Sequence, residues 1–268
     1  MNIKIYLILI LGFTGGLVKI LGSILHGSRS LFVDALTSFA NLVSLLATIY
    51  FYRVSRMPPD HDHPYGHYRL GFGGSFVSLI AYGYVAGIAS MELLYSIEYT
   101  VELESLYYAL AGLLLYGLAI YLSLEIGGFF KAYGLFTISE LYESMVTLIA
   151  VVAGALYSYL IDYIGAIGLT LYIFYELFSI GRETFYSMID KTAPQQLLEE
   201  VKRVFEEMGF QITDLRIRCI ASNIYHGDIR IKMYRTMDLN NAYRLIKELK
   251  KYLKEKYNLE LVVEIDLH

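Results

Sequence analysis

Pro59-Asp60-His61-Asp62-His63-Pro64-Tyr65-Gly66-His67 is a short, strongly polar stretch between two long apolar segments. The flanking segments, residues 31–55 and 72–97, each exceed the roughly 20 apolar residues that a helix needs to cross a bilayer. The stretch is therefore predicted to be a loop at a membrane surface. This arrangement favours a fold built on membrane-spanning helices.

The same length criterion applied along the chain predicts six transmembrane helices. The first is too long for the core of a signal peptide and lacks a convincing cleavage site, so it is expected to be retained. The fold class is thus an all-α membrane domain of six helices. The predicted spans are residues 3–25, 31–55, 72–97, 105–130, 135–160 and 162–186.

A change in composition near Lys191 marks a second domain. Charged residues make up 18% of the chain, and most lysines and arginines fall after this point. Residues 1–190 are therefore assigned to the transmembrane domain and residues 191–268 to a small α+β domain with dimerisation or regulatory roles. Its pattern is ferredoxin-like, αββαβ: helix 194–208, strands 212–219 and 227–235, helix 239–256 and strand 259–266.

The basic residues near the helix ends predict the orientation in the membrane. Lys4, Arg53, Arg56 and Arg69 fall on one side, which the positive-inside rule makes cytoplasmic. Both termini and the histidine loop should therefore lie in the cytoplasm, with the protein in the inner (plasma) membrane and in contact with lipid. The net charge of −4 predicts no nucleic-acid partner, and the single Cys219 fits a reducing compartment.

The chemistry of the loop points to metal binding, because imidazole nitrogen together with carboxylate oxygen suits a borderline divalent ion such as zinc. Three of the six histidines lie here, beside Asp60 and Asp62. An ordinary hydrated loop is the alternative. A metal-binding loop between membrane spans indicates that the protein handles metal ions across a bilayer.

Three stretches of the chain resemble the cation diffusion facilitator family of divalent-metal transporters. They are Gly27-Ser28-Arg29-Ser30-Leu31-Phe32-Val33-Asp34-Ala35, the loop Asp60–His67, and Asp190-Lys191-Thr192-Ala193-Pro194. The resemblance implies a homodimer that exchanges a cytosolic metal ion for protons, a carrier and not an enzyme. It also implies a loop site formed by Asp60, His63 and His67 that binds zinc or manganese, with His61 and Asp62 facing solvent.

The resemblance further implies an ion site between the second and fifth helices, with two ligands four residues apart on each. The matching positions on the second helix are Thr37 and Asn41. The fifth helix offers Glu140 and Glu143, in one of two registers. One pairs Glu140 with Ser144, and the other pairs Ser139 with Glu143. We favour the second register because it keeps an acid at the position that is usually acidic.

In the family, the four ligands are usually Asp or His, and this chain departs from that pattern at most of the matching positions. The resulting site contains only oxygen ligands. Such a site suits manganese, magnesium or a monovalent cation better than zinc. A carboxylate at membrane depth is costly and usually functional, and it could also carry the proton. One alternative is that Thr37 and Asn41 only form hydrogen bonds between helices, and another is that Glu140 and Glu143 face interfacial water. A separate alternative for the function is a transport-inactive homologue that acts as a metal sensor or structural partner.

Two further regions carry expectations. Asp34 is either a group behind the ion ligands or an exposed helix cap that pairs with Arg29. In the tail, Thr213, Arg230, Tyr243 and Glu264 occupy positions where the family often binds further metal, while Asp266 is retained. Arginine repels a cation, so we expect no well-formed metal cluster there. The alternating strands are better explained as a dimer interface.

Overall fold

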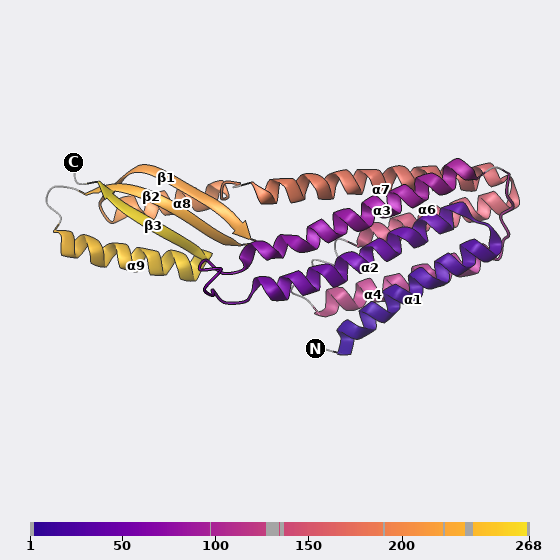
Figure 1. Cartoon of the computed structure of the whole chain (residues 1–268), viewed down its shortest axis with the longest axis horizontal. Helices are drawn as coiled ribbons and strands as arrows, with labels where there is room; N and C mark the ends of the chain where they lie inside the picture. The colour runs from indigo at the N-terminus through magenta and orange to yellow at the C-terminus, as the bar shows by residue number, and fades with distance from the viewer. Residues whose placement is uncertain are drawn as a thin grey trace. The chain divides into compact units, whose positions relative to one another are not determined.

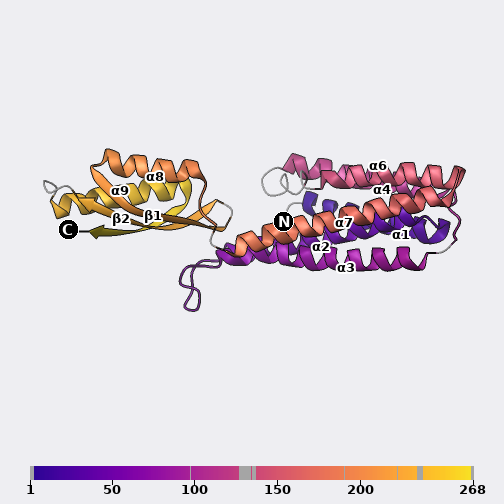
Figure 2. The ribbon, with the colours of Figure 1, turned by 90° about the horizontal axis from the view of Figure 1, so that it is seen from above.

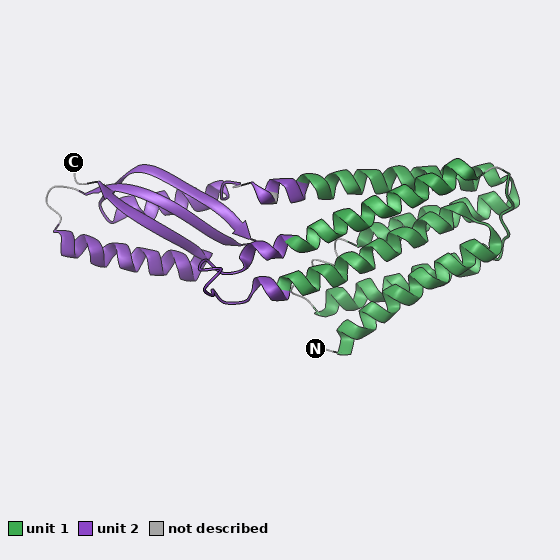
Figure 3. Cartoon of the chain, viewed as in Figure 1, with its two compact units in different colours: residues 1–52, 73–182 green, residues 53–72, 183–268 purple. Residues whose placement is uncertain are grey.

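The computed structural model describes residues 3–96, 98–126, 134, 137–189, 191–221, 223–233 and 238–266. They form two compact units (Figure 3), one of Met1–Tyr52 with Gly73–Arg182 and the other of Arg53–Phe72 with Glu183–His268. The histidine loop therefore belongs to the same unit as the tail. Asp190, which opens the third family-like stretch, and His268 lie outside the described residues.

The first unit consists of long apolar helices that run side by side (Figure 1). Six helices of the described residues are long and apolar enough to cross a membrane, which confirms the predicted six spans. They are α1 (Ile3–His26), α2 (Arg29–Ser55), α3 (Gly73–Tyr95), α4 (Ser105–Ile126), α6 (Ile138–Leu156) and α7 (Tyr159–Met188).

Small residues allow these helices to approach one another closely. On α1, a Cβ at Gly15 would lie only 2.9 Å from the ring of Tyr116 on α4. Glycine and alanine at such contacts are typical of membrane helix pairs, where close packing provides much of the stabilisation. Small residues also lie where α2, α3 and α7 pack together, in a buried apolar cluster that includes Ala40, Ala86 and Ala166.

The second unit holds the tail, whose element order confirms the predicted αββαβ pattern. Strand β1 (Phe210–Ala221) pairs antiparallel with β2 (Ile224–Met233), and β2 pairs parallel with β3 (Leu259–Asp266). Helices α8 (Gln195–Glu207) and α9 (Leu239–Tyr257) of the tail cover the same face of this sheet (Figure 2), because their apolar residues pack on one common core. The elements are α8 (Gln195–Glu207), β1 (Phe210–Ala221), β2 (Ile224–Met233), α9 (Leu239–Tyr257) and β3 (Leu259–Asp266), preceded in this unit by the 3₁₀ turn Tyr68–Phe72.

Candidate functional site

Charged and polar side chains from α1, α2 and α6 converge inside the helix bundle. We call this group the intramembrane cluster, and its members are Lys19, Asp34, Ser38, Asn41, Glu140 and Ser144. Each of them is at most 1% exposed. The Lys19 ammonium donates hydrogen bonds to Asp34 Oδ1 at 2.7 Å, to Ser144 Oγ at 2.9 Å and to Ser38 Oγ at 3.0 Å. It also lies 3.7 Å from Glu140 Oε2.

Side chains of α2 hold the Glu140 carboxylate in place. Asn41 Nδ2 donates to Glu140 Oε1, and Ser38 Oγ lies 3.1 Å from Oε2. The amide oxygen of Asn41 in turn accepts a hydrogen bond from the Tyr82 hydroxyl on α3. Glu140 and Asn41 are therefore neighbours inside the bundle, joined through the amide nitrogen of Asn41.

Glu143 is buried on the same helix but lacks such support. It is 4% exposed, and neither carboxylate oxygen has a hydrogen-bond partner among the described residues. The Thr37 hydroxyl approaches it, yet this hydroxyl donates to the backbone carbonyl of Asp34 at 2.9 Å. Thr147 on α6 also has a buried hydroxyl without a partner in the described part of the chain. An unpartnered buried carboxylate is costly, which marks Glu143 as a functional candidate.

The contacts differ between the two registers considered for the fifth spanning helix, α6. Glu140 and Ser144 both face the intramembrane cluster, where Ser144 contacts Lys19 and Asp34. Ser139 is only half-buried and instead donates to Glu176 on α7 at 3.3 Å. The favoured pairing of Ser139 with Glu143 stays a prediction, because Thr37 of α2 approaches Glu143 whereas Ser139 contacts α7. Both glutamates are buried within the bundle.

The possibility that Asp34 is an exposed cap paired with Arg29 is wrong. Asp34 is fully buried and binds Lys19, whereas Arg29 pairs with Glu92 on α3. Helix α2 begins at Arg29, whose backbone N–H donates to Asp162 of α7 at 2.7 Å. Asp162 thus caps the helix, and Asp34 lies more than one turn inside it, beyond the reach of the capping positions.

Sequence reasoning missed three members of this region: Lys19, Ser38 and Glu176. Lys19 is a lone lysine in the first apolar span, and an ionisable residue within a span was itself a sufficient signal. Glu176 in the last span gave the same signal. Glu176 is 8% exposed, and its Oε2 has no partner among the residues that the structure describes.

The second metal candidate is the loop cluster, formed by Asp60, His63 and His67. One ligand atom from each lies within 4.8 Å of the other two. His63 Nδ1 is 3.1 Å from Asp60 Oδ1, and His67 Nε2 is 3.3 Å from Asp60 Oδ2. His67 is buried, whereas His61 and Asp62 are exposed.

Hydrogen bonding prepares Asp60 to act as a charged ligand. The backbone N–H of His63 donates to Asp60 Oδ1 at 2.7 Å, and this bond lowers the pKa of Asp60 below its usual value. The carboxylate is therefore ionised at neutral pH. One carboxylate and two imidazoles form a set of three protein ligands that suits a borderline divalent ion.

In the described part of the tail, the positions at which the resemblance implies further metal do not form a comparable group of metal ligands. Arg230 forms an ion pair with Glu264 at 2.9 Å, and Thr213 donates to the backbone carbonyl of Arg230. Tyr243 is exposed. The positive charge of Arg230 beside Glu264 disfavours a metal cation at this pair.

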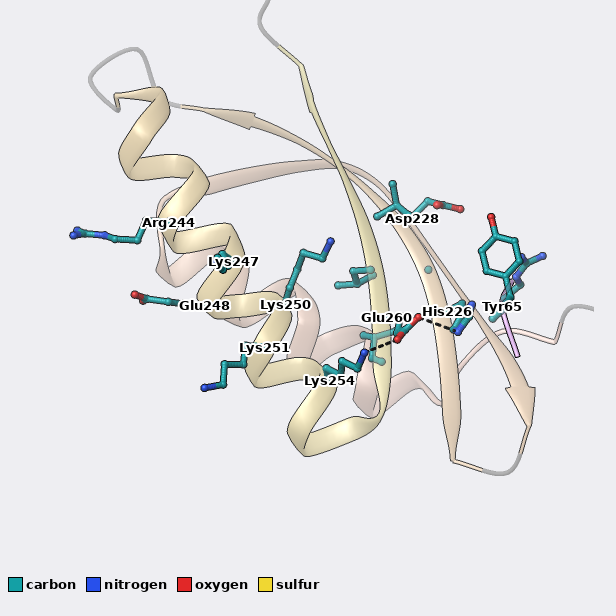
Figure 4. A pocket seen from close by; sticks show the side chains of 15 residues that line it. Tyr65, His226, Asp228, Arg244, Lys247, Glu248, Lys250, Lys251, Lys254 and Glu260 are labelled. Atoms are coloured by element: carbon teal, nitrogen blue, oxygen red, sulfur yellow. Dashed lines mark hydrogen bonds and ion pairs between the residues drawn. The ribbon is translucent and has the colours of Figure 1, made fainter. Parts of the chain in front are cut away.

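A cavity of about 850 Å³ lies in the second unit, beside α9 and β3, with Tyr65 of the loop at its edge. Figure 4 shows Glu260 between His226 and Lys254, with which it interacts. Most of the charged side chains lining this cavity are basic, and they disfavour a metal cation there. They are Arg218, Arg244, Lys247, Lys250, Lys251 and Lys254.

Comparisons with known proteins agree on one family. The profile of the cation efflux transmembrane domain matches residues 4–189. The manganese efflux system protein MneS of Bacillus subtilis is 23% identical over 262 residues, which cover 91% of this chain and 87% of that protein. The cation-efflux pump FieF of Shewanella oneidensis is 22% identical over 242 residues, covering 85% of this chain and 80% of its own length.

Proposed function

The chain belongs to the cation efflux (cation diffusion facilitator) family, and from that premise we propose that it exports a divalent metal ion in exchange for protons. The family is one of transporters, and the six apolar helices make the chain an integral membrane protein. We place it in the inner membrane as a homodimer with both termini in the cytoplasm, and we assign it no enzymatic activity.

The observation that carries this proposal is the contact of Glu140 with Asn41 inside the bundle, with the unpartnered Glu143 on the same helix. These groups and Thr37 supply oxygen ligands only. Oxygen ligands favour manganese or magnesium over zinc, which gains more from imidazole and thiolate. Two relatives are named as manganese efflux proteins, which supports manganese as the substrate.

Proton exchange would use the same carboxylates. A divalent ion binds a carboxylate only in its ionised form, so metal binding releases any proton held there. Protonation of the emptied carboxylate would then discharge it and allow the return of the empty carrier. Glu143 suits this role because no described group fixes its oxygens. The ion site would alternate between the two membrane faces as the helices rock.

Zinc or manganese would also bind at the loop cluster, as a ligand and not as the transported ion. The loop shares a unit with the tail, so a metal there would act on cytoplasmic structure. The tail itself would provide the dimer contact through its alternating strands.

Reconstitution into liposomes tests the exchange. A proton gradient, acidic inside, should drive uptake of manganese, and collapse of the gradient with a protonophore should stop it. Glu125→Gln is the matched control, because Glu125 is an exposed glutamate on α4 that pairs with Lys4. Manganese uptake that is unchanged when the proton gradient is collapsed would contradict the exchange of metal for protons.

A transport-inactive homologue that senses metal at the loop is the second candidate. One observation favours it: a buried ammonium, that of Lys19, already lies 3.7 Å from Glu140. This candidate predicts zinc binding at the loop without flux of any divalent ion in liposomes.

A further inference from the structure

Lys19 places a fixed positive charge next to the proposed ion site. An ammonium has three N–H donors, and Asp34, Ser144 and Ser38 accept one each at 2.7 to 3.0 Å. The carboxylate of Glu140, at 3.7 Å, is a fourth and longer contact. The lysine is thus fully satisfied without Glu140, although it is close enough to neutralise it.

The bundle is shaped around this side chain. On α4, a Cβ at Gly112 would lie 2.5 Å from Lys19 Cγ and 2.8 Å from Cε. Only glycine leaves room there for the lysine stem. The ring of Tyr116, also on α4, lies 5.0 Å from the ammonium, in the range of a cation–π contact. The neighbouring helix α4 therefore accommodates both the stem and the ammonium of Lys19.

The charges around Lys19 are arranged asymmetrically. Asp34 binds it directly, and its two carboxylate oxygens also accept from Ser144 at 3.2 and 3.3 Å. Glu140 divides its interactions between Lys19 on one side and Asn41 on the other. A divalent ion on Glu140 would meet strong repulsion from the ammonium, because the two cations would share one carboxylate in a poorly screened interior.

We propose that Lys19 is a resident counter-cation that sets the metal affinity of the intramembrane site. In the metal-free protein its ammonium shares Glu140, and it withdraws toward Asp34 when a divalent ion takes that carboxylate. Asp34 is thus the anchor of the lysine and not a metal ligand. This inference rests on the proposed function, because it specifies how the same site is kept weak enough to release its cargo.

Two substitutions that break the same ion pair should move metal affinity in opposite directions. Lys19→Met removes the competing cation and should tighten manganese binding about tenfold or more. Asp34→Asn removes the anchor, so the ammonium turns to Glu140 and binding should weaken about tenfold. The double variant has neither and should bind as tightly as Lys19→Met. Mere damage to the structure would weaken binding in all three.

The experiment measures binding of manganese to purified full-length protein in detergent, by electron paramagnetic resonance of the free ion. All variants carry His63→Ala with His67→Ala, so that the loop does not contribute. Lys4→Met is the matched control, because Lys4 lies on the same helix in an exposed ion pair with Glu125. Should Lys19→Met fail to fold, Lys19→Gln keeps a hydrogen-bond donor for Asp34 and tests the same loss of charge.

The outcomes separate the inference from the proposed function. Opposite shifts in the two single variants support the inference. Equal affinity of Lys19→Met and its parent, or shifts in the same direction, overturn it and leave metal export standing. Binding by Lys19→Met but not by its parent supports the lysine's role and overturns export. Binding by neither overturns both.

Discussion

The intramembrane cluster and the loop cluster both bring potential metal ligands together, but they differ in ligand type, exposure and charge. The intramembrane cluster offers oxygen ligands, is fully buried and contains an ammonium of its own. The loop cluster offers two imidazoles and a carboxylate, with Asp60 and His63 exposed. The first set of ligands would suit a hard ion, and the second would suit zinc.

The difference also concerns what each site has to do. A carrier must release its ion, so a weak site with a competing cation serves transport. A loop that only holds an ion gains from ligands fixed in advance, such as Asp60 with its hydrogen bond from His63. Under the proposed function, the intramembrane cluster would serve transport and the loop cluster regulation, and we expect that each can be removed without the other.

Loss of the Glu140 carboxylate should have the largest effect. Glu140→Gln removes the charged ligand that contacts Asn41, and manganese flux in liposomes should fall about tenfold to a hundredfold, the usual worth of a charge-assisted contact. Glu125→Gln, the exposed control, should transport like the wild type. Full flux in Glu140→Gln would show that the intramembrane cluster is not the ion site.

Glu143 should separate activity from stability. Glu143→Gln should abolish proton-driven flux and yet raise the free energy of unfolding by about 1–3 kcal/mol, because a buried carboxylate without a partner is costly. Thermal unfolding in detergent beside the flux assay measures both. A destabilised Glu143→Gln variant would mean that the carboxylate has a structural partner and a structural role.

The loop should affect zinc binding only. His63→Ala with His67→Ala should remove one bound zinc per chain at micromolar concentration, while manganese flux stays within about twofold of the wild type, less than the worth of one typical hydrogen bond. Equilibrium binding with a zinc indicator gives the stoichiometry. Unchanged zinc binding would show that the loop cluster is not a zinc site.

Removal of metal ions with a chelator should have the smallest effect, because we expect it to leave the dimer intact. Arg230 and Glu264 form an ion pair whose arginine disfavours a metal cation there, so the proposed dimer should not need metal. Full-length protein in detergent with a chelator should sediment as a dimer. A monomer that assembles only after zinc is added would give the tail a metal site.

The sequence was sufficient for the architecture because its signals are local. Six long apolar segments and the alternation in strands such as β2 depend only on neighbouring residues, and both were predicted correctly. The loop cluster was equally accessible, since its three members lie within eight positions.

The interior of the bundle depends on contacts between distant helices, and there the prediction was incomplete. Lys19 and Ser144 are far apart in the chain but 2.9 Å apart in space. The depth of Asp34 depends on Asp162, which caps α2 from the last spanning helix. No pattern within one helix reveals such pairs, although an ionisable residue in each span was a signal that they exist.

The most direct test of the account is the ratio of manganese to zinc flux in liposomes, measured under the same proton gradient. The oxygen-only site predicts that manganese flux exceeds zinc flux, and that the ratio is unchanged in the variant His63→Ala with His67→Ala. Zinc flux above manganese flux, or a preference that disappears with the loop histidines, would contradict the separation of the two clusters.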